Sequence, residues 1–190
     1  LHRADDPAQV THARAALRHP RVIPYGQSMG AAAILRAVDA CGVRPDAIIV
    51  EAVFDKMLNT VRHRFEAMGL PPFPGAELLV FWGGLQAGFN GFEHAPAKYA
   101  ASVACPILFL HGSDDPRARV EEARRVFAAV PAWNRFEEFP ALGHEPSSSR
   151  YPERWRSAVG HLLAEANIEA AGRGSGRSRE PAGPPLTHLE

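Results

Sequence analysis

The pentapeptide Gly26-Gln27-Ser28-Met29-Gly30 places a serine between two glycines, where a short apolar run gives way to small residues. A serine hydroxyl becomes a nucleophile when a base removes its proton and nearby dipoles stabilise the developing oxyanion. A sharp strand-to-helix turn would expose Ser28 and direct the Met29 N–H toward that oxyanion, and the glycines would let strand and helix approach closely. The pattern favours nucleophilic catalysis by Ser28, although the same residues also suit a helix with Ser28 as N-cap.

A serine nucleophile needs a histidine base, and the base needs an acceptor that fixes its tautomer. The apolar run 106–110 (PILFL) leads into HGSDDP, which supplies Asp115, with Asp114 as an alternative. The weaker run 135–139 (RFEEF) leads into PALGHEP, where His144 follows a glycine. Each candidate therefore follows a predicted strand, and the carboxyl ends of parallel strands meet at one edge of a sheet.

Other titratable residues lie close to these positions in the sequence. His111 adjoins its strand and precedes the acid, so we interpret it as a packing or loop-ordering histidine. Glu51 and Asp55 are further alternatives for the acid, and Asp55 is also expected to cap a helix that begins near Lys56. The remaining histidines have no cysteine or carboxylate partner at ligand spacing, so neither a metal site nor a cofactor is expected.

The spacing of apolar residues predicts the elements that position these groups. Strands are predicted over 22–25, 47–54, 106–110 and 135–139, and helices over 5–18, 29–40, 56–68, 76–82, 120–130 and 151–166. Gly42 is expected to end the second helix. Continuous apolar strands that alternate with helices predict an α/β fold with a parallel sheet covered on both faces. We expect one domain over 1–170 and a disordered tail over 171–190, where Gly, Ser, Arg, Glu and Pro dominate.

The composition narrows the choice of partners. The 190 residues carry 21 basic and 21 acidic side chains, so the formal net charge is zero and no nucleic-acid partner is expected. No apolar run approaches the roughly 18 residues of a membrane span. The first residues contain no apolar signal region, which predicts a cytoplasmic location. Cys41 and Cys105 are interpreted as buried free thiols.

These motifs resemble the α/β-hydrolase superfamily over residues 5–167. GQSMG is similar to its nucleophile elbow, HGSDDP to its acid loop and LGHEP to its histidine loop, in the family's order. The resemblance is strongest to serine-aminopeptidase-like and prolyl-oligopeptidase-like bacterial hydrolases. It implies a triad of Ser28, Asp115 and His144, with the Met29 N–H as an oxyanion donor and no cofactor.

The chain departs from the family pattern before the elbow. Family members have several strands there, and an early loop supplies a second oxyanion donor, whereas one predicted helix precedes the elbow in this sequence. The four predicted strands correspond to the last four of the usual eight, so the elbow strand is expected to have an unpaired outer edge. We expect the chain to be the C-terminal portion of a longer hydrolase, with its activity alone in doubt.

Residues 55–100 lie where this superfamily commonly carries cap helices, although a helical excursion that packs on its own sheet is an equal alternative. Gln27, Phe81, Trp82 and Phe89 are predicted to contact substrate. The resemblance implies hydrolysis of an ester, thioester or amide in a small-molecule or peptide substrate. A non-catalytic binding domain and an acyltransferase with the same triad are the alternatives.

Overall fold

The structure is a computed structural model that describes residues 21–175, with side chains to residue 167. Its centre is a parallel sheet of β1 (Tyr25–Gln27), β2 (Ile48–Glu51), β3 (Ile107–Gly112) and β4 (Asn134–Phe139) in the order β1-β2-β3-β4. The predicted α/β class with four parallel strands is confirmed. The predicted helix 5–18 and residues 176–190 of the predicted tail 171–190 lie outside the described residues.

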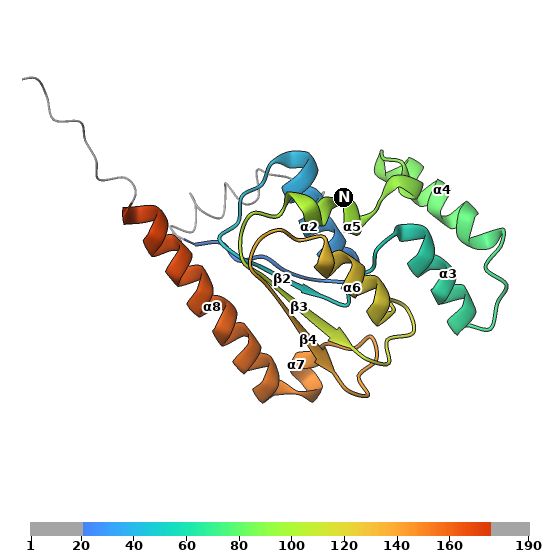
Figure 1. The fold of residues 1–190 in the computed structure, drawn as a ribbon. Coiled ribbons are helices and arrows are strands. Elements are labelled where there is room, and N and C mark those ends of the chain that lie inside the picture. Colours follow the sequence, from blue (N-terminus) through green and yellow to red (C-terminus); the bar gives the residue numbers. More distant parts are fainter. Residues whose placement is uncertain (1–20, 176–190) are drawn as a thin grey trace, which may run out of the picture.

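Helices cover both faces of the sheet and produce three layers (Figure 1). On one face, α2 (Met29–Cys41), α5 (Pro96–Tyr99) and α6 (Val120–Ala128) enclose a core of buried aliphatic and aromatic side chains. On the other, α8 (Pro152–Ser175) packs Ala158, Leu162 and Ala166 against Leu108, Leu110 and Phe139. The strands β2 and β3 are buried on both sides, as their continuous apolar sequences predict.

The strand that leads to Ser28 is displaced from its predicted range. Pairing with β2 begins at Tyr25, opposite Ile49, and continues through Gln27, opposite Glu51. Within residues 21–175, β1 pairs with β2 alone, so one edge of β1 has no strand beside it. The unpaired outer edge expected from the resemblance is thus confirmed for the described part of the chain.

The connection between β2 and β3 contains a helical pair beyond the carboxyl ends of the strands (Figure 1). It consists of α3 (Met57–Ala67) and α4 (Gly75–Ala87), followed by the short turns η1 (Gly91–Glu93) and η2 (Ala100–Ser102) that flank α5. The helix predicted over 76–82 is longer and ends where Gly88 adopts a left-handed conformation with φ 73°. No residue of α3 is fully buried, so this pair packs more loosely than the helices that cover the sheet.

Three further expectations are wrong in detail. Cys41 is exposed at the end of α2, whereas Cys105 is buried as predicted, and both are free thiols. The last helix continues to Ser175, past its predicted end at residue 166. Asp55 lies two residues before α3 and one before its N-cap Lys56, so it does not cap that helix.

No helix of the described chain has the length and apolar character needed to cross a membrane.

Candidate active site

Ser28 lies at the turn between β1 and α2, in a strained backbone conformation. Its φ of 53° and ψ of −112° lie in a region that costs a non-glycine residue roughly 1–3 kcal/mol. The Ser28 N–H donates to the Glu51 carbonyl at 2.8 Å, which ties the turn to β2. Ser28 occupies the N-cap position of α2, but its hydroxyl accepts no capping hydrogen bond. This geometry is unlike the extended N-cap that was the alternative interpretation of Ser28.

The two glycines that flank the serine differ in their surroundings. A Cβ atom on Gly26 would lie 2.5 Å from the Gly30 carbonyl carbon and 2.7 Å from the Ala31 nitrogen. A Cβ on Gly30 would meet no atom within 4 Å. The expectation of a close strand–helix approach is therefore confirmed at Gly26 and wrong at Gly30.

Met29 is the first residue of α2. Its N–H is one of the first four in the helix, which have no acceptor within the helix and lie at the positive end of the helix dipole. That N–H is therefore available to an anionic oxygen next to Ser28.

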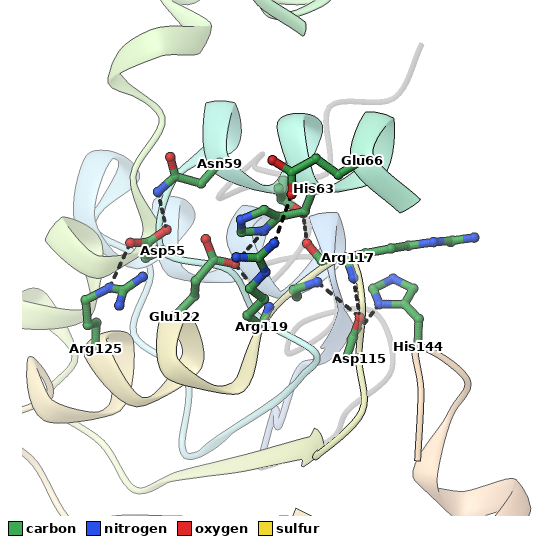
Figure 2. A network of polar contacts seen from close by, with 12 residues as sticks. Asp55, Asn59, His63, Glu66, Asp115, Arg117, Arg119, Glu122, Arg125 and His144 are labelled. Carbon is green, nitrogen blue, oxygen red and sulfur yellow. Dashed lines mark hydrogen bonds and ion pairs between the residues drawn. The ribbon is translucent and has the colours of Figure 1, made fainter. Parts of the chain in front are cut away.

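Asp115 and His144 are joined directly, as Figure 2 shows: the His144 Nδ1 lies 2.7 Å from the Asp115 Oδ2. The other carboxylate oxygen accepts hydrogen bonds from the Arg117 N–H at 2.8 Å and the Ala118 N–H at 3.1 Å. Burial on its own raises the pKa of Asp115, but the hydrogen bonds from His144, Ala118 and Arg117 outweigh it and hold that pKa below its ordinary value. An ionised Asp115 fixes the tautomer in which His144 Nε2 is free to accept a proton.

The acid loop and the histidine loop are held together by backbone contacts. The Ser113 N–H donates to the Phe139 carbonyl at 2.9 Å, and the Asp114 N–H donates to the Leu142 carbonyl at 3.0 Å. A Cβ atom at Gly112 would lie 2.2 Å from the Leu142 carbonyl oxygen. Only glycine at position 112 allows the two loops to approach this closely.

The alternative acids and bases make other contacts. Asp114 accepts from the Ser113 hydroxyl at 2.7 Å, and Asp55 forms an ion pair with Arg125 at 2.9 Å. His111 is buried, and its Nε2–H donates to the Ala118 carbonyl at 2.8 Å, which confirms the loop-ordering interpretation. Burial lowers the pKa of His111, so it is neutral at pH 7.

Glu51 supports the histidine loop from beneath, a role that sequence reasoning missed. Its buried carboxylate accepts from the Ser147 N–H at 2.6 Å and from the Tyr25 hydroxyl. Beside it, the Gln27 side-chain amide donates to the His144 carbonyl at 2.8 Å. Burial, with the hydrogen bond and negative charge of Glu51, raises the pKa of Tyr25 above its ordinary value. The strand ends thus hold the base in place at two points.

Ser28 and His144 line one small cavity of about 110 Å³. The rest of its wall comes from α2, α3 and the loops that precede α3 and α6: Met29, Phe54, Met57, Thr60, Val61, Arg64 and Arg117. His144 also lines an open depression of about 610 Å³, together with Asp114, Pro116, Arg117, Gly143 and Glu145. The helix α3 therefore forms part of the wall beside the nucleophile.

The aromatic residues predicted to contact substrate lie elsewhere on the helical pair. Phe81 and Trp82 are half-exposed on α4 and pack edge to face, with ring centroids 5.4 Å apart. Phe89 lies beneath the Arg36 guanidinium and beside His94. None of the three lines the cavity beside Ser28.

A second polar cluster connects α3 to α6 (Figure 2). Asp55 accepts from Asn59 at 3.0 Å and pairs with Arg125, while Glu122 lies 3.6 Å from His63 Nδ1. Burial, then the hydrogen bond and negative charge of Asp55, raise the pKa of Glu122 to about 8. Burial on its own raises the pKa of Asp55, but the hydrogen bonds from Asn59, Glu122 and Arg125 outweigh it and lower that pKa.

These groups do not suggest a metal centre. Among the residues that the structure describes, no three His, Cys, Asp or Glu side chains lie together in a way that could hold a metal ion. The arrangement around Ser28 instead combines a strained serine, a histidine and the carboxylate that holds it, which are the components of acyl transfer.

No family model matches the chain. Over 66 residues it is 33% identical to the uncharacterized peptidase YuxL of Bacillus subtilis, a segment that covers 33% of this chain and 10% of that protein. The chain thus spans about a tenth of this curated relative.

Solved structures resemble the chain over most of its length. An esterase of Pyrococcus furiosus, PF2001, superposes with a TM-score of 0.61 at 19% identity, covering 83% of this chain and 59% of that one. A monoacylglycerol lipase of Paleococcus ferrophilus superposes with a TM-score of 0.57 at 18% identity, covering 84% and 74%. The chain has the α/β-hydrolase fold.

Proposed function

We propose that this α/β-hydrolase chain carries the triad of a serine hydrolase, which cleaves an ester, thioester or amide through an acyl-enzyme. The observation that supports this most strongly is the hydrogen bond between His144 and a buried Asp115, on the wall of the cavity that Ser28 also lines. The hydrolase names of the similar structures agree with this proposal.

In the proposed reaction, His144 Nε2 accepts the proton of the Ser28 hydroxyl as Ser28 Oγ forms a bond to the substrate carbonyl carbon. The electron pair of the carbonyl moves to its oxygen, which the Met29 N–H stabilises. When the tetrahedral intermediate collapses, the bond to the leaving group breaks and His144 returns the proton to it. Water then attacks the acyl-enzyme by the same steps and regenerates Ser28.

Asp115 has a supporting role in this scheme. Its carboxylate holds the His144 ring through Nδ1 and stabilises the imidazolium that forms when Nε2 takes the proton. Because three hydrogen bonds keep Asp115 ionised, the stabilising charge is present throughout the neutral range.

A fluorophosphonate probe tests the proposal, since such probes phosphonylate activated serines with loss of fluoride. The full-length protein is expected to be labelled once, and Ser28→Ala is expected to abolish labelling. Ser102→Ala is the matched control, because Ser102 is an exposed serine that bonds to Asp39 away from the site. Equal labelling of the Ser28→Ala variant would show that another residue is the nucleophile.

A further inference from the structure

The cavity beside Ser28 has an unusual distribution of charge. Its wall includes two arginines, Arg64 from α3 and Arg117 from the acid loop, and no aspartate or glutamate. Most of the other residues in the wall have apolar side chains, namely Met29, Phe54, Met57 and Val61. The cavity therefore combines an apolar lining with two exposed guanidinium groups.

Neither arginine has an ion-pair partner among the described residues, in contrast to their neighbours. Arg62, two residues before Arg64, pairs with Glu77 at 2.5 Å, and Arg119, two residues after Arg117, pairs with Glu66 at 2.9 Å. In Figure 2 the Arg117 side chain extends past the His144 ring. Two positive charges are thus left uncompensated beside the proposed nucleophile.

The open depression that His144 also lines has a different set of charged residues from the cavity beside Ser28. It contains Asp114 and Glu145 together with Arg117, and Glu145 lies 3.7 Å from Arg150. Because the depression carries both signs of charge, an anionic ligand is favoured in the cavity beside Ser28 and not in the depression.

We propose that the cavity is the acyl subsite, and that Arg64 and Arg117 select an acyl group whose short apolar chain ends in a carboxylate. This inference rests on the proposed serine hydrolase function and names its substrate class. The guanidinium fork matches the two oxygens of a carboxylate, while the methionine, phenylalanine and valine side chains contact the intervening methylenes. The volume of about 110 Å³ restricts the cavity to a short acyl chain, such as the adipoyl group.

The test compares p-nitrophenyl hexanoate with mono-p-nitrophenyl adipate, which have the same leaving group and acyl length and differ in the terminal carboxylate. In the full-length protein, kcat/KM is expected to favour the adipate ester after subtraction of its spontaneous hydrolysis. Arg64→Gln and Arg117→Gln are each expected to reduce this preference about tenfold, as for a partly solvated charge-assisted hydrogen bond. Added salt should reduce it in the wild type.

Arg62→Gln is the matched control, since Arg62 is already paired, and it should leave the preference unchanged. An unchanged preference in both the Arg64 and Arg117 variants, or an equal loss on both esters, would overturn this inference alone. If neither ester is hydrolysed and Ser28 is not labelled by the probe, the proposed function is overturned as well. If Ser28 is labelled but neither ester is cleaved, the two uncleaved esters are compared for how well they protect Ser28 from labelling. The adipate ester should protect better than the hexanoate ester, and equal protection would overturn the inference.

Discussion

Glu122 offers a direct test of the polar cluster that connects α3 to α6. Its side chain is 2% exposed, and burial together with the Asp55 carboxylate raises its pKa from 4.5 to about 8. The change to make is Glu122→Gln, which keeps the shape and an oxygen that can accept from the Arg119 N–H. The variant removes only the ability to ionise.

The sign of the effect follows from proton binding. Between about pH 4.5 and pH 8 the unfolded chain has lost the Glu122 proton while the folded protein retains it, so stability falls as pH rises through this window. At about 1.4 kcal/mol per pH unit, the loss between pH 4.5 and pH 7 amounts to about 3 kcal/mol. Glutamine does not ionise, so the variant is expected to gain about that much relative to the wild type over this interval.

Urea denaturation at pH 4.5, 7 and 8.5 measures the free energy of unfolding of both proteins. Asp55 does not interfere, because its lowered pKa confines its own contribution to pH values below its ordinary range. Glu121→Gln is the matched control, since Glu121 is an exposed neighbour on the same helix, and it should show no such dependence. A difference between Glu122→Gln and wild type that stays constant from pH 4.5 to 8.5 would refute the reasoning.

Three further predictions concern the residues that hold the base. Asp115→Asn should lower kcat on a p-nitrophenyl ester about 10³- to 10⁴-fold, and a smaller than tenfold effect would contradict its assigned role. Gly112→Ala should lower the melting temperature and the rate together, because its Cβ would overlap the Leu142 carbonyl. Glu51→Gln should cost roughly 1–3 kcal/mol in the free energy of unfolding and lower kcat, since the Ser147 N–H and the Tyr25 hydroxyl share two carboxyl oxygens and the amide offers one oxygen. Unchanged kcat and stability in this variant would exclude a supporting role.

Local patterns predicted much of the fold because their causes are local. The small and apolar residues after Ser28 form α2 over Met29–Cys41, and the helix ends as expected where Gly42 takes a left-handed φ of 67°. The apolar run at 106–110 becomes β3 because it is buried on both faces. Placing the site residues after strands predicted that the acid loop and the histidine loop meet, since a parallel sheet brings those loops to one edge. The choice of Asp115 over Asp114 as the partner of His144 came mostly from the family resemblance.

Contacts between distant segments were not predictable in the same way. Asp55 has the spacing of a helix cap, yet the approach of α6 offers it Arg125 and it forms an ion pair instead. Gln27 and Glu51 support the histidine loop because β1 and β2 end side by side beneath it. No spacing within one segment indicates such a partner, since the partner lies in another segment of the chain.

The strand order has a consequence for how the chain folds. Each strand pairs with the next one in sequence, so the sheet can grow by adding one strand at a time to an existing edge. The loop from β2 to β3 spans 52–106, whereas those on either side span 28–47 and 113–133. Closing the longer loop costs about 0.9 kcal/mol more in chain entropy. The unit β3–α6–β4 should therefore form early, and the pairing of β2 with β3, which completes the nucleophile's surroundings, should be the slower step.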